Sequence, residues 1–130
     1  MNLVLAYDGS DASKTALDLT KKLAKEMNAK VNVVVSRIGG RASDTKDIDE
    51  AEMQLKFVEE ALAEAGINCE QHLLIRGLQP GEDIVDFAED VHADFIIVGV
   101  AKTSRVGKIL TGSTAQHVIL NATCPVITVK

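Results

Sequence analysis

The sequence predicts an α/β fold, a parallel β-sheet covered by helices on both faces, and three observations support this. Short apolar segments alternate with amphipathic helical segments along all 130 residues. Aromatic residues make up only 3% of the chain, so the core must be aliphatic, which suits strands buried on both faces. Strand–helix alternation also implies right-handed crossovers and therefore parallel strands. At this length we expect one domain, residues 1–130.

The chain opens with a strand and a helix. Residues 2–7 are a short apolar segment typical of a buried strand. Ser10 follows turn residues and is placed to cap a helix that runs to about Asn28. Apolar residues recur along this helix at helical spacing, namely Ala12, Ala16, Leu19, Leu23 and Met27.

A second strand–helix unit follows. Residues 31–36 (VNVVVS) are β-branched and predict a central strand. Residues 37–44 are polar and form a loop. From 48 to 65 apolar positions step by three and four, which predicts a second helix, and Gly66 ends it as a C-cap.

The second half repeats the pattern and closes with a fifth strand. Residues 67–75 form the third strand, and Pro80 stands where the third helix begins, because its missing N–H costs nothing there. A short strand at 95–98 leads into the loop 99–113, a fourth helix and a last strand at 125–129. We expect a doubly wound sheet of strand order 3-2-1-4-5 with four helices on both faces.

Charge and hydropathy limit the partners. The net charge of −5 argues against duplex DNA or an anionic membrane, which select clustered Lys and Arg. No apolar run approaches the roughly 20 residues that span a bilayer, and no signal peptide is visible. We therefore expect a cytoplasmic protein with no nucleic-acid partner and no membrane insertion.

Cysteine and histidine spacing predicts no metal or redox site. Cys69 and Cys124 lack CxxC spacing, so we expect two reduced thiols in or near the core. His72, His92 and His117 have no partner at ligand or base spacing, which favours surface or edge positions.

The loop 99–113 is the main candidate for chemistry. Ligands of doubly wound sheets bind beyond the carboxyl ends of the strands where strand order reverses, so this loop and Asp8 should face each other. The loop (GVAKTSRVGKILTGS) combines glycines, hydroxyls and cations, and Gly112 with Ser113 begins the fourth helix. Free N–H groups and the positive dipole end favour an anion there. The pattern predicts a phosphate site; a polar connection carrying only a helix cap is the alternative.

Asp8 also has two interpretations. Its carboxylate is placed to accept hydrogen bonds from a ribose or to hold a metal with phosphate oxygens, whereas Asp is also favoured as a simple turn residue before a helix. Two common nucleotide motifs are missing: no GxGxxG follows a strand, and no GxxxxGK[ST] occurs.

The chain resembles the universal stress protein family over its whole length. The matching segments are LAYDGSDASKTAL, DFIIVG, GSTAQHVI and CPVITVK. The nucleotide-binding branch of that family carries a glycine, two residues, a glycine, nine residues, and then glycine with serine or threonine. Gly99 matches the first position, and Gly112 with Ser113 matches the last at full spacing. Lys102 replaces the second glycine.

The resemblance implies an adenine nucleotide alpha hydrolase-like fold that binds ATP or AMP, with Mg²⁺ left open. Asp8 would lie near the adenosine and Ser36 near the adenine. The residues implied around the phosphates are Gly99, Gly112, Ser113 and Thr114, and Val100, Lys102 and Arg105 complete the expected cofactor-binding set. The family's dimers often pair through the final strand, here Val126–Val129, and its members are generally stress-response regulators.

Lys102 has two possible effects. If the second glycine provides a positive φ or a close backbone approach, a lysine there weakens or abolishes binding. Alternatively its ammonium, with Arg105 and Lys108, adds positive charge to a triphosphate site. The gathering of three cations in an acidic protein favours the second interpretation.

The function expected from these observations is a homodimeric ATP- or AMP-binding module that signals stress or energy status, with its regulatory target unknown. One rival is a slow Mg²⁺-dependent ATPase that uses Asp8, although no candidate base is evident in the site loops, and no catalytic residue is assigned. The other is a nucleotide-free protein-interaction module of the same fold.

Overall fold

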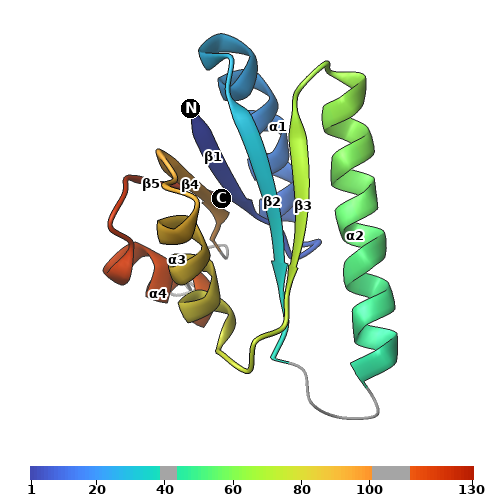
Figure 1. Cartoon of the computed structure of the whole chain (residues 1–130), viewed down its shortest axis with the longest axis vertical. Helices are drawn as coiled ribbons and strands as arrows, with labels where there is room; N and C mark the ends of the chain where they lie inside the picture. Colours follow the sequence, from blue (N-terminus) through green and yellow to red (C-terminus); the bar gives the residue numbers. More distant parts are fainter. Residues whose placement is uncertain (39–43, 101–111) are drawn as a thin grey trace, which may run out of the picture.

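The computed structural model describes residues 1–38, 44–100 and 112–130, and a five-stranded sheet lies at its centre (Figure 1). Its strands are β1 (Asn2–Ala6), β2 (Lys30–Ser36), β3 (Cys69–Leu74), β4 (Phe95–Gly99) and β5 (Val126–Val129). They are ordered β3-β2-β1-β4-β5, and all neighbouring pairs among these described strands are parallel. The predicted order 3-2-1-4-5 is confirmed.

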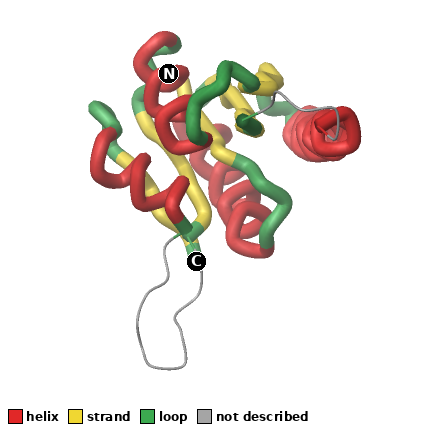
Figure 2. Tube along the Cα trace, turned by 90° about the horizontal axis from the view of Figure 1, so that it is seen from below, coloured by secondary structure: helices red, strands yellow, loops and turns green. Residues whose placement is uncertain are grey.

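Four helices of the described chain cover the sheet, two on each face (Figures 1 and 2). Helices α1 (Asp11–Met27) and α2 (Asp44–Glu64) pack on one face, and α3 (Pro80–Asp90) and α4 (Ser113–Asn121) pack on the other. Helix α2 begins at Asp44, four residues before the apolar periodicity starts at 48, and its first turn is polar.

Strand β1, at the centre of the sheet, is buried on both faces, which explains its apolar sequence. Leu3 and Leu5 belong to the core under α1 and α2, whereas Val4 and Ala6 belong to the core under α3 and α4. Successive side chains of a strand point to opposite faces, so one strand feeds both cores.

Local capping agrees with the sequence. The Ser10 Oγ accepts a hydrogen bond from the N–H of Ser13 at 3.1 Å and caps α1. Gly66 has φ +74° just beyond α2, a left-handed conformation that glycine adopts without steric cost. Pro80 is the first residue of α3.

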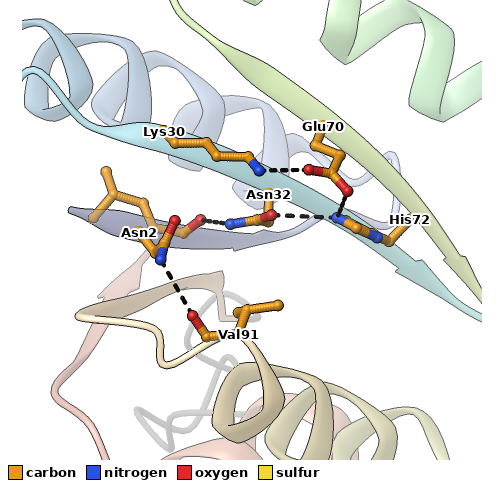
Figure 3. A network of polar contacts seen from close by, with 7 residues as sticks. Asn2, Lys30, Asn32, Glu70, His72 and Val91 are labelled. Carbon is orange, nitrogen blue, oxygen red and sulfur yellow. Dashed lines mark hydrogen bonds and ion pairs between the residues drawn. The ribbon is translucent and has the colours of Figure 1, made fainter.

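A partly buried polar network crosses β1, β2 and β3 (Figure 3). The Asn32 amide donates to the Leu3 carbonyl at 3.2 Å, so its Oδ1 accepts from His72 Nε2, also at 3.2 Å. The His72 ring centroid lies 4.4 Å from that of Phe87. Burial lowers the pKa of His72, although the nearby Glu70 carboxylate opposes this effect. The edge position predicted for His72 holds, but the side chain is half-buried and paired.

The other cysteines and histidines are spread over the fold. Cys69 and Cys124 are free, partly buried thiols near the two edges of the sheet, as their spacing indicated. Burial, reinforced by the charge of Glu59, raises the pKa of Cys69 to about 11, and burial also raises the pKa of Cys124. His92 is exposed, in agreement with the prediction, whereas His117 is half-buried on α4.

Candidate functional site

A cavity of about 460 Å³ opens at the carboxyl ends of β1, β2 and β4. These strand ends lie at the lower side of the sheet in Figure 1. The ends of these strands and the first turns of α1, α3 and α4 form its wall. Strands β2 and β3 lie on one side of β1, and β4 and β5 lie on the other. The cavity therefore lies where the strand order reverses, between β1 and β4. The volume falls within the usual range of small-molecule sites.

The inner part of the cavity is apolar. It is lined by Ala6, Val34, Ile84, Val98 and Val100. All five belong to the core under α3 and α4, so their positions are fixed by packing. A slot of this kind suits the flat apolar faces of an aromatic ring.

The outer part of the cavity is polar and includes the first turn of α4. Gly112 is the N-cap residue of this helix and has no side chain to satisfy the N–H groups of the turn. These groups, together with the positive end of the helix dipole, favour an anion. Ser113 and Thr114 add hydroxyl groups to the same wall. The predicted start of the fourth helix is confirmed.

Gly99 lies at the end of β4, where it meets α1. A Cβ added at Gly99 would stand 2.7 Å from the carbonyl carbon of Ala12 and 2.8 Å from the backbone nitrogen of Ser13. No side chain fits at that distance from rigid backbone. The structure therefore explains this glycine by the packing of a strand against a helix, in addition to its position on the cavity wall.

Asp8 lies in the β1–α1 turn and faces the cavity. Its Oδ1 accepts a hydrogen bond from the backbone N–H of Ser10 at 2.9 Å. Partial burial favours a higher pKa for Asp8, but hydrogen bonds from Ser10 and Ser13 and the charge of Arg37 together lower it below the ordinary value of 3.8. The carboxylate is therefore ionised at neutral pH and available as an acceptor.

Arg37 ties the end of β2 to α2 and to the β1–α1 turn. Its Nε donates to Asp47 at 3.0 Å, Nη1 to the Ser36 carbonyl at 3.0 Å and Nη2 to Gln54 at 3.4 Å. Gln54 in turn donates from Nε2 to the Asp8 carbonyl at 3.3 Å. These bonds fix the end of β2 and the β1–α1 turn, two parts of the cavity wall, relative to the first half of α2.

Behind Ser36 lies a fully buried carboxylate, Asp83, in the first turn of α3. The Ser36 hydroxyl donates to Asp83 Oδ2 at 3.5 Å. Arg76 forms an ion pair with Asp83 and also donates from Nη2 to its carbonyl at 3.2 Å. Pairing with a guanidinium offsets much of the cost of burying the charge.

The structure brings together most of the residues that the sequence predicted for the site. Those lining the cavity are Asp8, Ser36, Gly99, Val100, Gly112, Ser113 and Thr114. Lys102 and Arg105 lie outside the described residues. Sequence reasoning missed Arg37, Pro80 and Ile84, which also line it. Topology could have indicated them: each lies directly after the second strand or at the start of the third helix, at the carboxyl ends of the strands.

Residues 1–38, 44–100 and 112–130 contain no group of three or more His, Cys, Asp or Glu side chains suited to hold a metal ion. None of their helices combines the length and apolar character that crossing a bilayer requires.

Comparisons with known proteins agree with this architecture. The universal stress protein family model matches residues 1–130. A universal stress protein of Methanocaldococcus jannaschii is 34% identical over 139 residues, covering 98% of this chain and 81% of that protein. A solved universal stress protein from Archaeoglobus fulgidus shows a TM-score of 0.92 and 40% identity, with 100% of this chain and 98% of that chain covered. Another from Archaeoglobus fulgidus, in complex with dAMP, shows 0.85 and 37%, with the same coverage.

Proposed function

Because the chain belongs to the universal stress protein family, we propose that it binds an adenine nucleotide, ATP or AMP, in the cavity at the strand ends. The fold is the adenine nucleotide alpha hydrolase-like fold of that family. One observation carries the proposal: a single cavity joins an apolar slot to the N-terminus of α4. An aromatic base needs the first surface and a phosphate needs the second.

In the proposed complex, each part of the ligand contacts a different part of the cavity wall. The base enters the slot between the ends of β1, β2 and β4 and the start of α3. The phosphates lie at Gly112, Ser113 and Thr114, and the Asp8 carboxylate accepts from the ribose hydroxyls between them. The relative that is 37% identical and was solved with dAMP supports this class of ligand, because dAMP combines adenine, a sugar and one phosphate.

The biological role that we propose is a regulatory module in a stress response, which acts as a homodimer and signals stress or energy status through its bound nucleotide. The edge strand β5 supports the dimer, since in the described sheet it pairs on one side only. Ile119 and Leu120 on the preceding helix α4 are also exposed. An open sheet edge requires cover or a partner, and a second copy of β5 supplies one.

A slow Mg²⁺-dependent ATPase is less well supported. Asp8 and Asp11, which is in the first turn of α1, are the acidic side chains on the described wall of the cavity. Neither stands within an acidic or histidine cluster suited to hold a metal in the described chain. Asp8 accepts the Ser10 N–H, which suits a structural acceptor better than a base.

Thermal unfolding with and without nucleotide tests the proposal. Saturation with AMP or ATP at 100 times the dissociation constant should add about 2.7 kcal/mol to the free energy of unfolding. Guanosine and cytidine monophosphates at equal concentration control for nonspecific anion effects. An unchanged melting temperature with AMP, ADP and ATP, with no adenine absorbance in the purified protein, would favour the nucleotide-free interaction module instead.

A further inference from the structure

We infer that Ser36, oriented by Asp83 and Arg76, selects the nucleobase through its hydrogen-bond polarity: it favours a purine with an amino group at position 6 over one with a carbonyl group there. The inference rests on the proposed nucleotide function and adds to it a residue that determines base specificity. It is argued from the place of Ser36, the state of Asp83 and the direction of the hydrogen bond between them.

Ser36 stands where a base edge would meet the sheet. It is the last residue of β2, 7% exposed, and lines the cavity beside the apolar slot. Two residues earlier on the same face, Val34 forms part of that slot. Ile84 and Pro80 of α3 face it from the other side. A ring lying in the slot therefore presents an edge to the polar atoms at the end of β2.

The Ser36 hydroxyl donates its proton to Asp83 and not toward the cavity. Asp83 is 0% exposed and pairs through its carboxylate with the Arg76 guanidinium, so its oxygens act as hydrogen-bond acceptors. The sole donor that Ser36 can offer to it is the hydroxyl proton, across the 3.5 Å between Oγ and Oδ2. The Oγ lone pairs remain for the ligand.

A fixed acceptor distinguishes two purines of nearly equal size. The 6-amino group of adenine donates to the Ser36 oxygen. The 6-oxo group of hypoxanthine or guanine places a second acceptor against it, and both oxygens are then left without a proton. A buried polar group that loses its partner costs more free energy than a single hydrogen bond contributes.

A purely structural role of the Ser36–Asp83–Arg76 contact makes a different prediction. Arg76 also donates to the Asp83 carbonyl, so the ion pair joins the β3–α3 connection to the start of α3. If this were the whole role, its removal would weaken AMP and IMP binding equally. The selectivity between the two nucleotides is therefore the quantity that separates the two roles.

The experiment measures dissociation constants of AMP and IMP by isothermal titration calorimetry for the unmodified protein, Ser36→Ala and Asp83→Asn. Asp86→Asn is the matched control, because it makes the same change at an exposed position of α3. AMP and IMP also differ at ring nitrogen N1, so the change in their ratio on substitution isolates the contact of Ser36.

We expect the unmodified protein and Asp86→Asn to bind AMP more tightly than IMP. In Ser36→Ala the ratio of the two dissociation constants should be about tenfold closer to one. In Asp83→Asn the amide oxygen accepts from Arg76 and its NH₂ donates to Ser36. The Ser36 proton then points into the cavity, so the preference shifts further toward IMP than in Ser36→Ala. Far-UV circular dichroism and the melting temperature of the free proteins establish that each variant is folded.

The outcomes separate this inference from the proposed function. If AMP binds the unmodified protein and the AMP:IMP ratio stays the same in folded Ser36→Ala, the polarity mechanism is wrong while nucleotide binding stands. Equal ratios in Ser36→Ala and Asp83→Asn would remove Asp83 from the mechanism. If AMP fails to bind the unmodified protein, the proposed function itself fails.

Discussion

Gly99 and Ser13 approach so closely that a Cβ on the glycine would lie 2.8 Å from the serine backbone nitrogen. Gly99→Ala must therefore push β4 away from α1, and backbone atoms yield at high cost. We expect a loss of about 1–3 kcal/mol in the free energy of unfolding, as for other overpacked sites. Urea denaturation measures it, and an unchanged midpoint would show that the two elements separate freely.

Gly112→Ala is the matched substitution at the other glycine of the cavity wall. Among the described residues a Cβ there would meet no atom within 4 Å and φ is −58°, so we expect only the poorer N-cap to lower the free energy of unfolding, by at most about 1 kcal/mol. In the proposed complex the added methyl group occupies space that a phosphate needs. AMP affinity should fall at least tenfold. Unaltered affinity would place the phosphates elsewhere.

His72 should make stability fall as the solution becomes acidic. Burial lowers its pKa in the folded protein below the ordinary value of 6.5, so the unfolded chain binds more protons. The contribution to stability is complete above 6.5 and is lost as the pH drops through 6.5 toward the lower folded value. Urea titrations between pH 8 and pH 5 measure this slope.

Two histidine variants test the assignment of that slope. His72→Gln should flatten the pH dependence, whereas His92→Gln, at an exposed histidine, should leave it unchanged. The Glu70 carboxylate and the Lys30 ammonium face His72 and act on its pKa in opposite directions. An equal slope in both variants and the unmodified protein would assign the effect to other groups.

Thr128→Pro should separate the proposed dimer without unfolding the chain. The carbonyls of Pro125 and Val129 accept hydrogen bonds from β4, so by alternation along the strand the N–H of Thr128 points to the open edge. Proline removes that donor and is tolerated at edges whose N–H faces outward. Light scattering should give the mass of one chain, whereas Thr128→Val, which keeps the N–H, should remain at twice that mass. A dimeric Thr128→Pro variant would exclude pairing through β5.

Substitution of Lys102 decides between its two interpretations. If its ammonium contacts a triphosphate, both Lys102→Gly and Lys102→Gln weaken ATP binding, and AMP loses less because it carries fewer charges. We expect this result, with a several-fold increase in the dissociation constant of ATP. Tighter binding by Lys102→Gly alone would instead show that this position needs glycine. Competition titrations against a fluorescent ATP analogue measure each case.

Features that depend on neighbours in the sequence were predictable. The Ser10 cap, the start of α4 at Gly112 and the position of Asp8 each follow from a few adjacent residues. The strand order was predicted from the alternation of strands and helices together with the usual reversal of strand order between the first and fourth strands. The sequence alone therefore indicated that the cavity lies at the carboxyl ends of the strands, without knowledge of any side-chain contact.

Contacts between distant segments were not predictable. Ser36 and Asp83 are 47 residues apart, and Asp8 and Gln54 are 46 apart. No local pattern marks either pair, because Asp83 resembles any acidic residue in the first turn of a helix. Gly99 was correctly placed in the site, but its contact with α1 becomes visible only once β4 and α1 are packed together.

The two partly buried thiols make the protein its own reporter of edge opening. The thiolate is the form that attacks thiol reagents, and the raised pKa values keep both groups protonated at neutral pH in the folded chain. Cys69 begins β3 and Cys124 precedes β5, so each thiol reacts fast only while its own edge of the sheet is detached. Labelling rates followed at the two cysteines would therefore time the fraying of each edge separately, in the unaltered sequence and without an engineered cysteine.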